Sequence, residues 1–538
     1  MRRRQLLAAL PASLALPAGL AAPALTMTAL ATPALAAPPK VLIHVPQANL
    51  TSLDPVWTTA VVTRNSAHLL FETLYGRDEQ LNPQPQMVEG HRVEDNARRW
   101  TMRLRDGLRF HSGEPVTARD CVASLKRWMV RDPIGQTIAA RLDSLEAIDD
   151  RTLVWRLNKP FASLPYALAK TQPSPVIMPE RLALTDPYKQ VAEFIGSGPF
   201  RWVADEYVPG SRAVFAKFEQ YSPRPEPASH AAGGYRVLVD RVEWQILPDP
   251  ATAANALING EVDWIDQPLP DLLSRLKRAR GVTVGQIDNY GTFGAMRPNH
   301  LHGATANPGV RRAMMAAIDQ VEVMTAAMGN DASLFRAPVG YFLPGTPSAS
   351  DTGMATVRQR PGPEAIRRML AEAGYAGERI LCLHPTDQTF YDAFTSVAVA
   401  AWRAVGLNID DQSMDWGTIV QRRTNMEPLD KGGWSVFPAG FPAAEYRDPV
   451  FASNLRGNGR HAWFGWPEDA QVEGMREAWM DGTDEAELRR LDQAIQARSF
   501  ETVPFIPLGQ YLPPSAWRSN LQGILKGPVP VFWNVEKT

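Results

Sequence analysis

Cysteine is almost absent from this chain, because only Cys121 and Cys382 occur among its 538 residues. So few cysteines exclude a disulfide-rich scaffold, a zinc ribbon and a cysteine-held iron–sulfur cluster. Cys121 lies in a predicted helix and Cys382 in an apolar predicted strand. We expect both to be small buried side chains, since a disulfide would need their Cα atoms within about 7 Å and nothing in the sequence brings these elements together.

The chain also lacks an excess of charge of either sign. Lysine and arginine number 56, and aspartate and glutamate number 57, so the formal net charge is −1. This balance gives no basic footprint for nucleic acid, and we expect no nucleic-acid partner. The 45% of hydrophobic and 21% of charged residues are ordinary for globular proteins and exclude wholesale disorder. At about 150 residues a domain, the length suits three to four domains.

Motifs of the common enzyme classes are missing as well. The sequence has no Gly-Lys dipeptide, no His-Glu-x-x-His and no Gly-x-Ser-x-Gly, which excludes the usual phosphate-binding loop, zinc protease helix and nucleophile elbow. His300 and His302 form the nearest pair to a metal site, but without a third ligand a solvated polar pair explains them better. Ser197, between two glycines, suits a turn better than a nucleophile. We expect no catalytic residue, no metal site and no cofactor.

The first 36 residues have the pattern of an export signal. Three arginines at positions 2–4 precede an apolar stretch over 6–20, which Pro11 and Pro17 interrupt. A small-residue triplet ends at Ala36, and we expect cleavage there. The arginines suit both the general and the twin-arginine export routes. Since no later run reaches the roughly 18 apolar residues of a membrane span, we expect the mature protein to be soluble outside the cytoplasm.

Helical and strand patterns alternate along the mature chain, which favours an α/β fold. Strands are predicted over 41–45, 100–105, 244–248 and 380–383. One helix should begin after Thr117, whose hydroxyl can form a capping box with Asp120. Further helices are predicted from Asn307-Pro308 through Val321, and over 366–373 with a stop at Gly374.

Several motifs along the mature chain point to one family. The longest is WTMRLRDGLRFHSGEPVTARD over 100–120. Two shorter motifs precede it and five follow it along the chain: LDP over 53–55, FETLY over 71–75, IGSGPF over 195–200, ALINGEVD over 256–263, VRRA over 310–313, AID over 317–319 and LAEAGY over 370–375. Together they resemble the family 5 extracellular solute-binding proteins, which are the dipeptide, oligopeptide and nickel receptors of ABC importers.

This resemblance implies an α/β, two-lobed periplasmic-binding-protein-like fold of type II, in the cluster with an extra inserted domain, with mixed sheets and flanking helices. The expected domains are a signal peptide (1–36), lobe 1 (37–75, 194–290 and 496–538), an inserted domain (76–193) and lobe 2 (291–495). The chain would cross between lobes near 289–291 and near 498–504, forming a hinge for opening and closing.

The resemblance also implies a site for the α-amine of a peptide, held in this family by an acid that closely follows a Gly-Trp pair. Here Gly433-Trp434 is followed by SVFP, which contains no acid, and the next carboxylates are Glu445 and Asp448. Glu445 could have taken over the role, and an ordinary surface acid explains it equally well. The departure leaves the substrate open.

Other ligand-binding candidates come from rings and from polar loops. Aromatic residues gather in the expected second lobe, where they could line a cleft, although we expect at least half of them to pack in the core: Trp416, Trp434, Phe437, Phe441 and Tyr446. Loops at the carboxyl ends of strands are where open α/β sheets bind ligands, which selects Asn49, Thr51 and Ser52 after the first strand. Asn299 is a candidate on the lobe 2 side.

The sequence thus predicts a periplasmic substrate-binding component of an ABC transporter. It would capture a peptide or related small organic solute by lobe closure and deliver it, as a monomer, to a permease complex in the inner membrane. A secreted hydrolase with an aromatic cleft, using acids such as Glu445 and Asp448, is the alternative. Within the transport role, a metal complex, haem or an opine-like compound could replace the peptide, because the fold does not fix the ligand.

Overall fold

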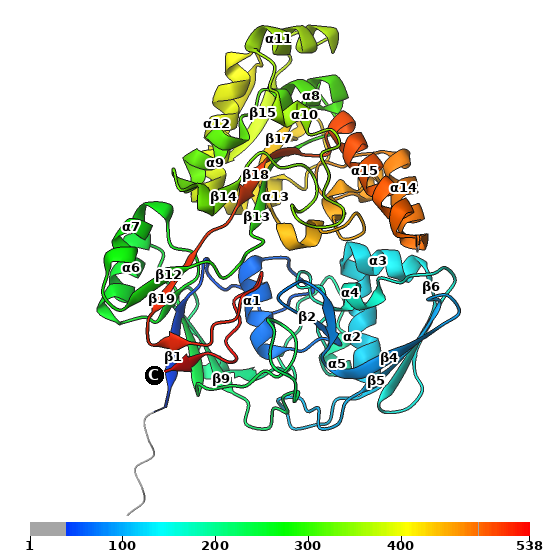
Figure 1. Ribbon diagram of the computed structural model, residues 1–538, viewed down its shortest axis with the longest axis vertical. Coiled ribbons are helices and arrows are strands. Elements are labelled where there is room, and N and C mark those ends of the chain that lie inside the picture. Colours follow the sequence, from blue (N-terminus) through cyan, green and yellow to red (C-terminus); the bar gives the residue numbers. More distant parts are fainter. Residues whose placement is uncertain (1–38, 483) are drawn as a thin grey trace, which may run out of the picture. The chain divides into compact units, whose positions relative to one another are not determined.

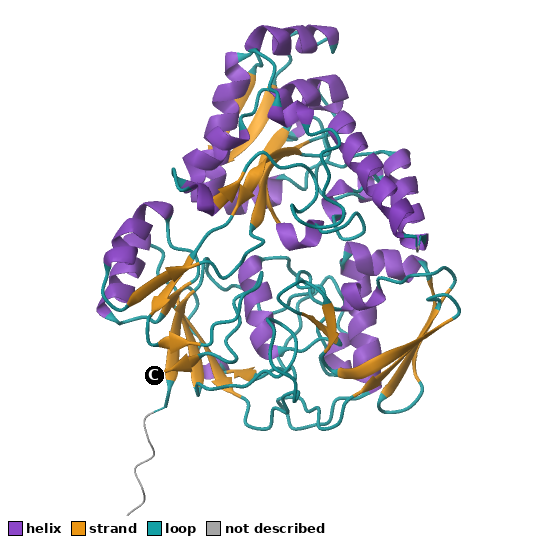
Figure 2. Cartoon of the chain, in the orientation of Figure 1, coloured by secondary structure: helices purple, strands orange, loops and turns teal. Residues whose placement is uncertain are grey.

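The structure, a computed structural model, describes residues 39–482 and 484–538 (Figure 1). The expected signal peptide and its cleavage position at Ala36 lie outside these residues. Figure 2 shows strands and helices mixed throughout the chain, as predicted for an α/β fold. Across the described residues we find no helix that is long and apolar enough to span a membrane.

The first sheet has seven strands in the order β12-β19-β11-β1-β10-β9-β8. Their bounds are Val41–Val45 (β1), Phe200–Trp202 (β8), Arg212–Lys217 (β9), Arg241–Gln245 (β10), Trp264–Ile265 (β11), Val282–Gly285 (β12) and Ser515–Arg518 (β19). The central β1 is parallel to both of its neighbours, β10 and β11. Helices α1 (Val61–Leu70), α6 (Pro250–Asn259) and α7 (Pro270–Arg278) accompany this sheet. The strand predicted over 41–45 is confirmed as β1, whereas the strand predicted over 244–248 is confirmed only in its first two residues, because β10 ends at Gln245.

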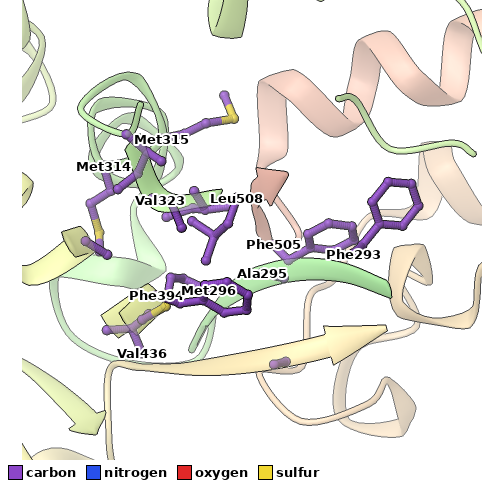
Figure 3. Packing of buried hydrophobic residues seen from close by; sticks show 14 of the residues in the cluster. Phe293, Ala295, Met296, Met314, Met315, Val323, Phe394, Val436, Phe505 and Leu508 are labelled. Carbon is purple, nitrogen blue, oxygen red and sulfur yellow. The ribbon is translucent and has the colours of Figure 1, made fainter. Parts of the chain in front are cut away.

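The second sheet has six strands in the order β14-β18-β13-β17-β15-β16. Their bounds are Thr292–Pro298 (β13), Phe335–Arg336 (β14), Ile380–Pro385 (β15), Ile409–Met414 (β16), Val436–Pro442 (β17) and Ile506–Tyr511 (β18). Its helices are α8 (Pro308–Ala316), α9 (Gln320–Met328), α10 (Ala355–Arg358), α11 (Pro363–Glu372), α12 (Thr389–Ala404), α13 (Trp416–Arg422), α14 (Ala470–Asp481) and α15 (Glu485–Thr502). Figure 3 shows part of the core that they build, with Met296 of β13, Val436 of β17 and Phe394 of α12 close together.

A third sheet, β4-β5-β7-β6, is antiparallel and has its own core. Its strands are Val88–Glu94 (β4), Arg99–Leu104 (β5), Leu142–Ala147 (β6) and Thr152–Leu157 (β7), with helices α2 (Ala118–Arg131), α3 (Pro133–Ala140), α4 (Leu164–Leu168) and α5 (Glu180–Ala183). Short strand pairs complete the chain: β2 (Tyr75–Arg77) with β3 (Pro83–Pro85), and β20 (Leu521–Gln522) with β21 (Glu536–Lys537). The predicted capping box is confirmed, because Thr117 and Asp120 exchange both hydrogen bonds at the start of α2.

One predicted helix is wrong. The pattern from Asn307 through Val321 is divided between α8 and α9, because the Asp319 carboxylate accepts hydrogen bonds from the backbone amides of Val321 and Glu322 and starts a new helix. Val321 is consequently exposed rather than buried. The helix predicted over 366–373 is confirmed as α11, with Gly374 in a left-handed conformation just beyond its end.

The chain crosses between the first two sheets twice (Figure 1). The first crossing lies between β12 and β13, over residues 286–291, close to where the sequence predicts it. The second lies between β18 and β19, over 512–514, and not at 498–504. Residues 506–511 pair with β13 and β14, and their apolar side chains complete the core of the second sheet.

Both cysteines are free and buried. Cys121 packs in the core beside the third sheet and Cys382 in that of the second sheet, so the prediction of two separate small buried side chains is confirmed.

Candidate functional site

A pocket of about 370 Å³ lies where the first two sheets meet. Its walls come from the carboxyl-terminal ends of strands in both sheets and from both crossing segments. The volume falls within the range of small-molecule sites in proteins. The hollow beside Phe218 is lined by residues 111–113 and by residues between 201 and 240, and the hollow beside Gly340 by residues 338–358 and Gln496, so neither has walls from both of the first two sheets.

The parallel strands of the first sheet supply one wall. Gln47 follows β1, Pro248 follows β10, and Asp266 directly follows β11. Because these three strands are parallel, their carboxyl ends meet at one edge of the sheet. This is the edge at which open α/β sheets bind ligands.

The second sheet supplies the opposite wall in the same way. β15 is parallel to β16 and to β17, and the loop after its carboxyl end leads into α12. This loop and the first turn of α12 bring Asp387, Phe390 and Tyr391 to the pocket, while β17 contributes Gly440.

Aromatic side chains of this wall pack around a glycine. The ring centroids of Phe390 and Tyr511 lie 5.1 Å apart. A Cβ added to Gly440 would lie 2.7 Å from the hydroxyl oxygen of Tyr391 and 3.0 Å from that of Tyr511. Only glycine therefore lets both hydroxyls approach the backbone of β17 here.

Arg64, in α1, brings a positive charge to the pocket although it is only 8% exposed. Its Nε and Nη2 donate to the side-chain oxygen of the neighbouring Asn65 at 3.0 and 2.9 Å. Within the described residues Arg64 forms no ion pair, and its Nη1 makes no hydrogen bond. Burial accordingly lowers the pKa of its guanidinium, and nearby carboxylates counter this only in part.

Asp266 and Asp288 bring negative charge to the same pocket. Burial raises the pKa of Asp266 to about 6, partly opposed by Arg64 and by the backbone amide of Gln47. Burial also raises the pKa of Asp288, which lies in the first crossing segment and accepts a hydrogen bond from the backbone amide of Tyr290 at 2.8 Å. Neither carboxylate forms an ion pair with a side chain of the described chain.

The aromatic candidates from the sequence are found mostly in the core. The rings of Trp434, Phe437, Phe441 and Tyr446 are at most 3% exposed and belong to the core of the second sheet, as expected for at least half of the set. Trp416 is partly buried against Tyr391, with centroids 4.9 Å apart, but does not line the pocket. Rings bury large apolar areas wherever they can, which accounts for this placement.

The polar candidates also miss the pocket. Asn49 and Thr51 are exposed, and Ser52 is buried beside Asp54, whose backbone amide donates to the serine hydroxyl at 3.3 Å. The pocket instead takes Gln47, earlier in the same loop. Asn299 is fully buried, where its side-chain nitrogen donates to the carbonyl of Trp434 at 2.9 Å.

Glu445 lies in a structural ion pair and not in the pocket. Its carboxylate accepts hydrogen bonds from both terminal nitrogens of Arg77, at 3.0 and 3.3 Å, and one from the hydroxyl of Thr171 at 3.2 Å. Both charged side chains are at least nine-tenths buried. With its acceptors occupied in this way, Glu445 is poorly placed to hold a ligand amine.

His300 and His302 do not make a metal centre, and no group of three potential ligands occurs in the part of the chain that the structure describes. They follow β13 rather than lying on it, and a ring nitrogen of His302 lies 3.0 Å from the carbonyl oxygen of Met426. Both histidines are partly exposed.

Sequence reasoning missed the charged residues of the pocket. Asp266 carried a usable signal, because it directly follows a short apolar strand at the sheet edge where ligands bind. Arg64 and Asp288 carried none, since a helix interior and a connecting segment hold charged residues throughout any protein.

Comparison with known sequences identifies relatives over most of the chain. The family described as "Bacterial extracellular solute-binding proteins, family 5 Middle" matches residues 82–462. The probable peptide ABC transporter periplasmic-binding protein y4tO of Sinorhizobium fredii (strain NBRC 101917 / NGR234) is 36% identical over 498 residues, which are 91% of this chain and 92% of that protein.

Solved structures share the fold at lower identity. The dipeptide binding protein of Pseudoalteromonas sp. SM9913, in complex with Met-Leu, matches 93% of this chain and 100% of its own with a TM-score of 0.77 and 18% identity. The protein AgaA of A. tumefaciens R10, in complex with agropinic acid, matches 93% and 99% with a TM-score of 0.77 and 20% identity. These likenesses confirm the predicted two-lobed α/β fold.

Proposed function

This chain belongs to the family 5 bacterial extracellular solute-binding proteins, and on that premise we propose that it is the substrate-binding component of an ABC importer. It captures a peptide or related small organic solute and delivers it to a permease complex in the inner membrane. The peptide class is supported by the name of the 36% identical relative, a probable peptide ABC transporter periplasmic-binding protein.

The observation that carries this proposal is the pocket between the first two sheets. Its walls belong to different sheets, which only two short crossings connect. A rotation about such crossings changes the separation of the walls without disturbing either core. A ligand that touches both walls then favours the closed arrangement through its greater affinity for it.

Domain assignment forms part of the same proposal. Lobe 1 is built on the first sheet, lobe 2 on the second, and the inserted domain on the third. The C-terminal part of lobe 1 then begins after Tyr511 and not at 496, because β18 belongs to the second sheet.

Binding without catalysis is also part of the proposal. The hydrolase alternative needed free carboxylates in an aromatic cleft, and Glu445 is paired with Arg77 instead. The carboxylate of Asp448 accepts hydrogen bonds from the backbone amides of Val450 and Phe451, at 3.0 and 3.1 Å, and is buried. The comparisons offer no support for a hydrolase, and we do not retain it.

We place the mature protein in the periplasm, as the name of the relative indicates for that protein. Export by either route, cleavage near Ala36, action as a monomer and the lack of a nucleic-acid partner complete the proposal. Mass spectrometry of the periplasmic form gives the cleavage position, and size-exclusion chromatography with light scattering gives the oligomeric state.

A thermal-melting screen of the chain from residue 37 onward tests the ligand class. The panel holds di-, tri- and oligopeptides, nickel, oligosaccharides and haem. A ligand at 100 times its Kd adds about 2.7 kcal/mol, which raises the melting temperature of a protein of this size by about 2 to 4 °C. A rise with peptides is the expected result. A rise only with another class would overturn the peptide assignment and retain the transport role.

A further inference from the structure

The pocket has an unbalanced set of charges. Its charged side chains are Arg64, Asp266, Asp288 and Asp387, which sum to −2 when all four are ionised. The remaining lining residues are neutral, and they include several prolines, two tyrosines and the amides of Gln47 and Asn65. A ligand with no net charge, such as a zwitterion, would leave this excess of negative charge in the pocket uncompensated.

Two of these charges, on Arg64 and Asp266, are buried, a third on Asp288 is partly buried, and none of the three is paired with a described residue, which is costly. Arg64 and Asp266 are 8% and 7% exposed, and in the described chain neither they nor Asp288 takes part in an ion pair. An enclosed charge without a partner costs free energy that folding alone does not recover. Charges kept in this way within a pocket point to a ligand that pairs with them.

We propose, building on the proposed function, that the pocket selects a short peptide-like solute with a net positive charge. The carboxylates of Asp266 and Asp288 bind its α-ammonium group, and the guanidinium of Arg64 binds its carboxylate. Asp387, on the opposite wall, favours a further basic group on the ligand.

The immediate surroundings hold these groups ready for such contacts. The backbone amides of Tyr290 and Gly291 hold the carboxylate of Asp288 in place at the pocket. Asn65 engages Nε and Nη2 of Arg64, so Nη1 is left to donate to a ligand carboxylate. An ammonium group has three donors and can serve two carboxylates at once. Charge-assisted contacts of this kind are the stronger class of hydrogen bond.

This arrangement also explains how the chain manages without the family's amine-binding acid. The acid expected after Gly433-Trp434 is missing, and Glu445 is committed to Arg77. Asp266 instead directly follows β11 of the first sheet, and Asp288 lies in the first crossing segment. Gly433-Trp434, by contrast, lies just before β17 of the second sheet. The amine site has thus moved from lobe 2 to the side of lobe 1 and the hinge.

Calorimetric titration with a matched dipeptide series tests the proposal. Ala-Lys, Ala-Gln and Ala-Glu differ in side-chain charge, while N-acetyl-Ala-Lys and Ala-Lys amide each lack one charged end. We expect affinity to fall in the order Lys, Gln, Glu. Loss of either charged end should weaken binding by about 10-fold or more, the size of a charge-assisted hydrogen bond.

Variants assign the effect to residues. Asp288→Asn should weaken the affinity for Ala-Lys by about 10-fold and leave the affinity for N-acetyl-Ala-Lys nearly unchanged, because the acetylated ligand no longer uses that carboxylate. Arg64→Gln should also weaken the affinity for Ala-Lys by about 10-fold and leave the affinity for Ala-Lys amide nearly unchanged, because the amide has no carboxylate for Arg64 to bind. Asp143→Asn is the matched control, since Asp143 is exposed on β6 of the third sheet and should change neither ligand's affinity.

The outcomes distinguish failure of the charge-selectivity inference from failure of the proposed peptide-binding role. If dipeptides bind but acetylation and side-chain charge change their affinity by less than 3-fold, this inference is wrong and the peptide-binding role stands. If no dipeptide binds the wild-type chain, this inference is wrong; if the melting screen also shows no rise with tri- or oligopeptides, the peptide assignment is wrong as well. Because the ligand series is measured on the wild-type chain, it tests the charge selectivity of the pocket even if a variant fails to fold.

Discussion

Glu445 and Arg77 form a buried ion pair, with 3.0 Å between Oε1 and Nη1, that joins the segment after β17 to strand β2. Arg77 is fully buried, and its guanidinium also lies 5.9 Å from the ring centroid of Phe451. The pair therefore connects the second sheet's lobe to the N-terminal part of the chain. Glu445 is engaged in this pair and does not line the pocket.

Replacing Glu445 should cost stability rather than ligand selectivity. Glu445→Gln leaves the Arg77 guanidinium buried without its counter-ion, and breaking such pairs costs about 3 kcal/mol or more. Urea unfolding monitored by circular dichroism measures the change. Glu219→Gln is the control, because Glu219 is 74% exposed in a surface pair with Lys217, and surface changes of this kind stay within about 0.5 kcal/mol.

A different result would restore the role that the sequence suggested for Glu445. If Glu445→Gln left stability unchanged, weakened Ala-Lys and spared N-acetyl-Ala-Lys, then Glu445 would hold the ligand amine. The ion pair with Arg77 predicts instead a loss of stability and unchanged affinity for both ligands.

The stability of the ligand-free protein should depend on pH through Asp266. Its pKa is raised from 3.8 to about 6 by burial, so the folded state holds a proton that the unfolded state has already lost. The stability from this group is complete below pH 4 and is lost as the pH rises through 6, by roughly 3 kcal/mol in total. The groups that face it are Arg64, which lowers this pKa, and Asp288, which raises it.

Urea unfolding of the wild type and Asp266→Asn between pH 4 and pH 7.5 measures this effect. The difference in stability between the two chains should shift in favour of the variant as the pH rises, since asparagine carries no charge. A difference that is constant over this range would contradict the buried, unpaired carboxylate.

Filling the space beside Gly440 should damage the pocket. In Gly440→Ala the new methyl group would lie 2.7 and 3.0 Å from the hydroxyl oxygens of Tyr391 and Tyr511, so these two side chains, which line the pocket, would have to shift. We expect affinity for a bound peptide to fall by about 10-fold, equivalent to about 1.4 kcal/mol.

The matched control for that change is Gly474→Ala. Gly474 is exposed within α14, and a Cβ there would meet no atom within 4 Å. The substitution should raise stability by about 0.5 to 1 kcal/mol through helix propensity and leave affinity unchanged. Equal affinity of the Gly440→Ala and wild-type chains would show that the ligand does not reach this wall.

Local patterns predicted much of the fold, because their causes lie within a few residues. The capping box of Thr117 and Asp120 and the stop at Gly374 depend only on neighbours along the chain. The division at Asp319 was missed, since the apolar spacing continues across it and only the cap separates the helices. The late crossing was missed because β18 looks like any apolar strand, and its partners β13 and β14 lie far away in sequence.

The site was much harder to predict than the fold. Residue type selected Trp434 and Phe437 as ligand contacts, but the same ring area that binds ligands also fills cores, and only the packing decides between the two. The rule that ligands bind at the carboxyl ends of strands selected the loop after β1, and this loop does line the pocket, although through Gln47 and not through Asn49. Arg64 gains its role from three-dimensional proximity to Asp266 and Asp288, which no sequence spacing encodes.

A crystal structure of the mature chain with Ala-Lys, or with a better ligand from the screen, tests the central claim most directly. We expect a ligand between the first two sheets, with its ammonium group on Asp266 and Asp288 and its carboxylate on Arg64. A ligand bound elsewhere, or one whose amine meets Glu445 after displacing Arg77, would contradict it.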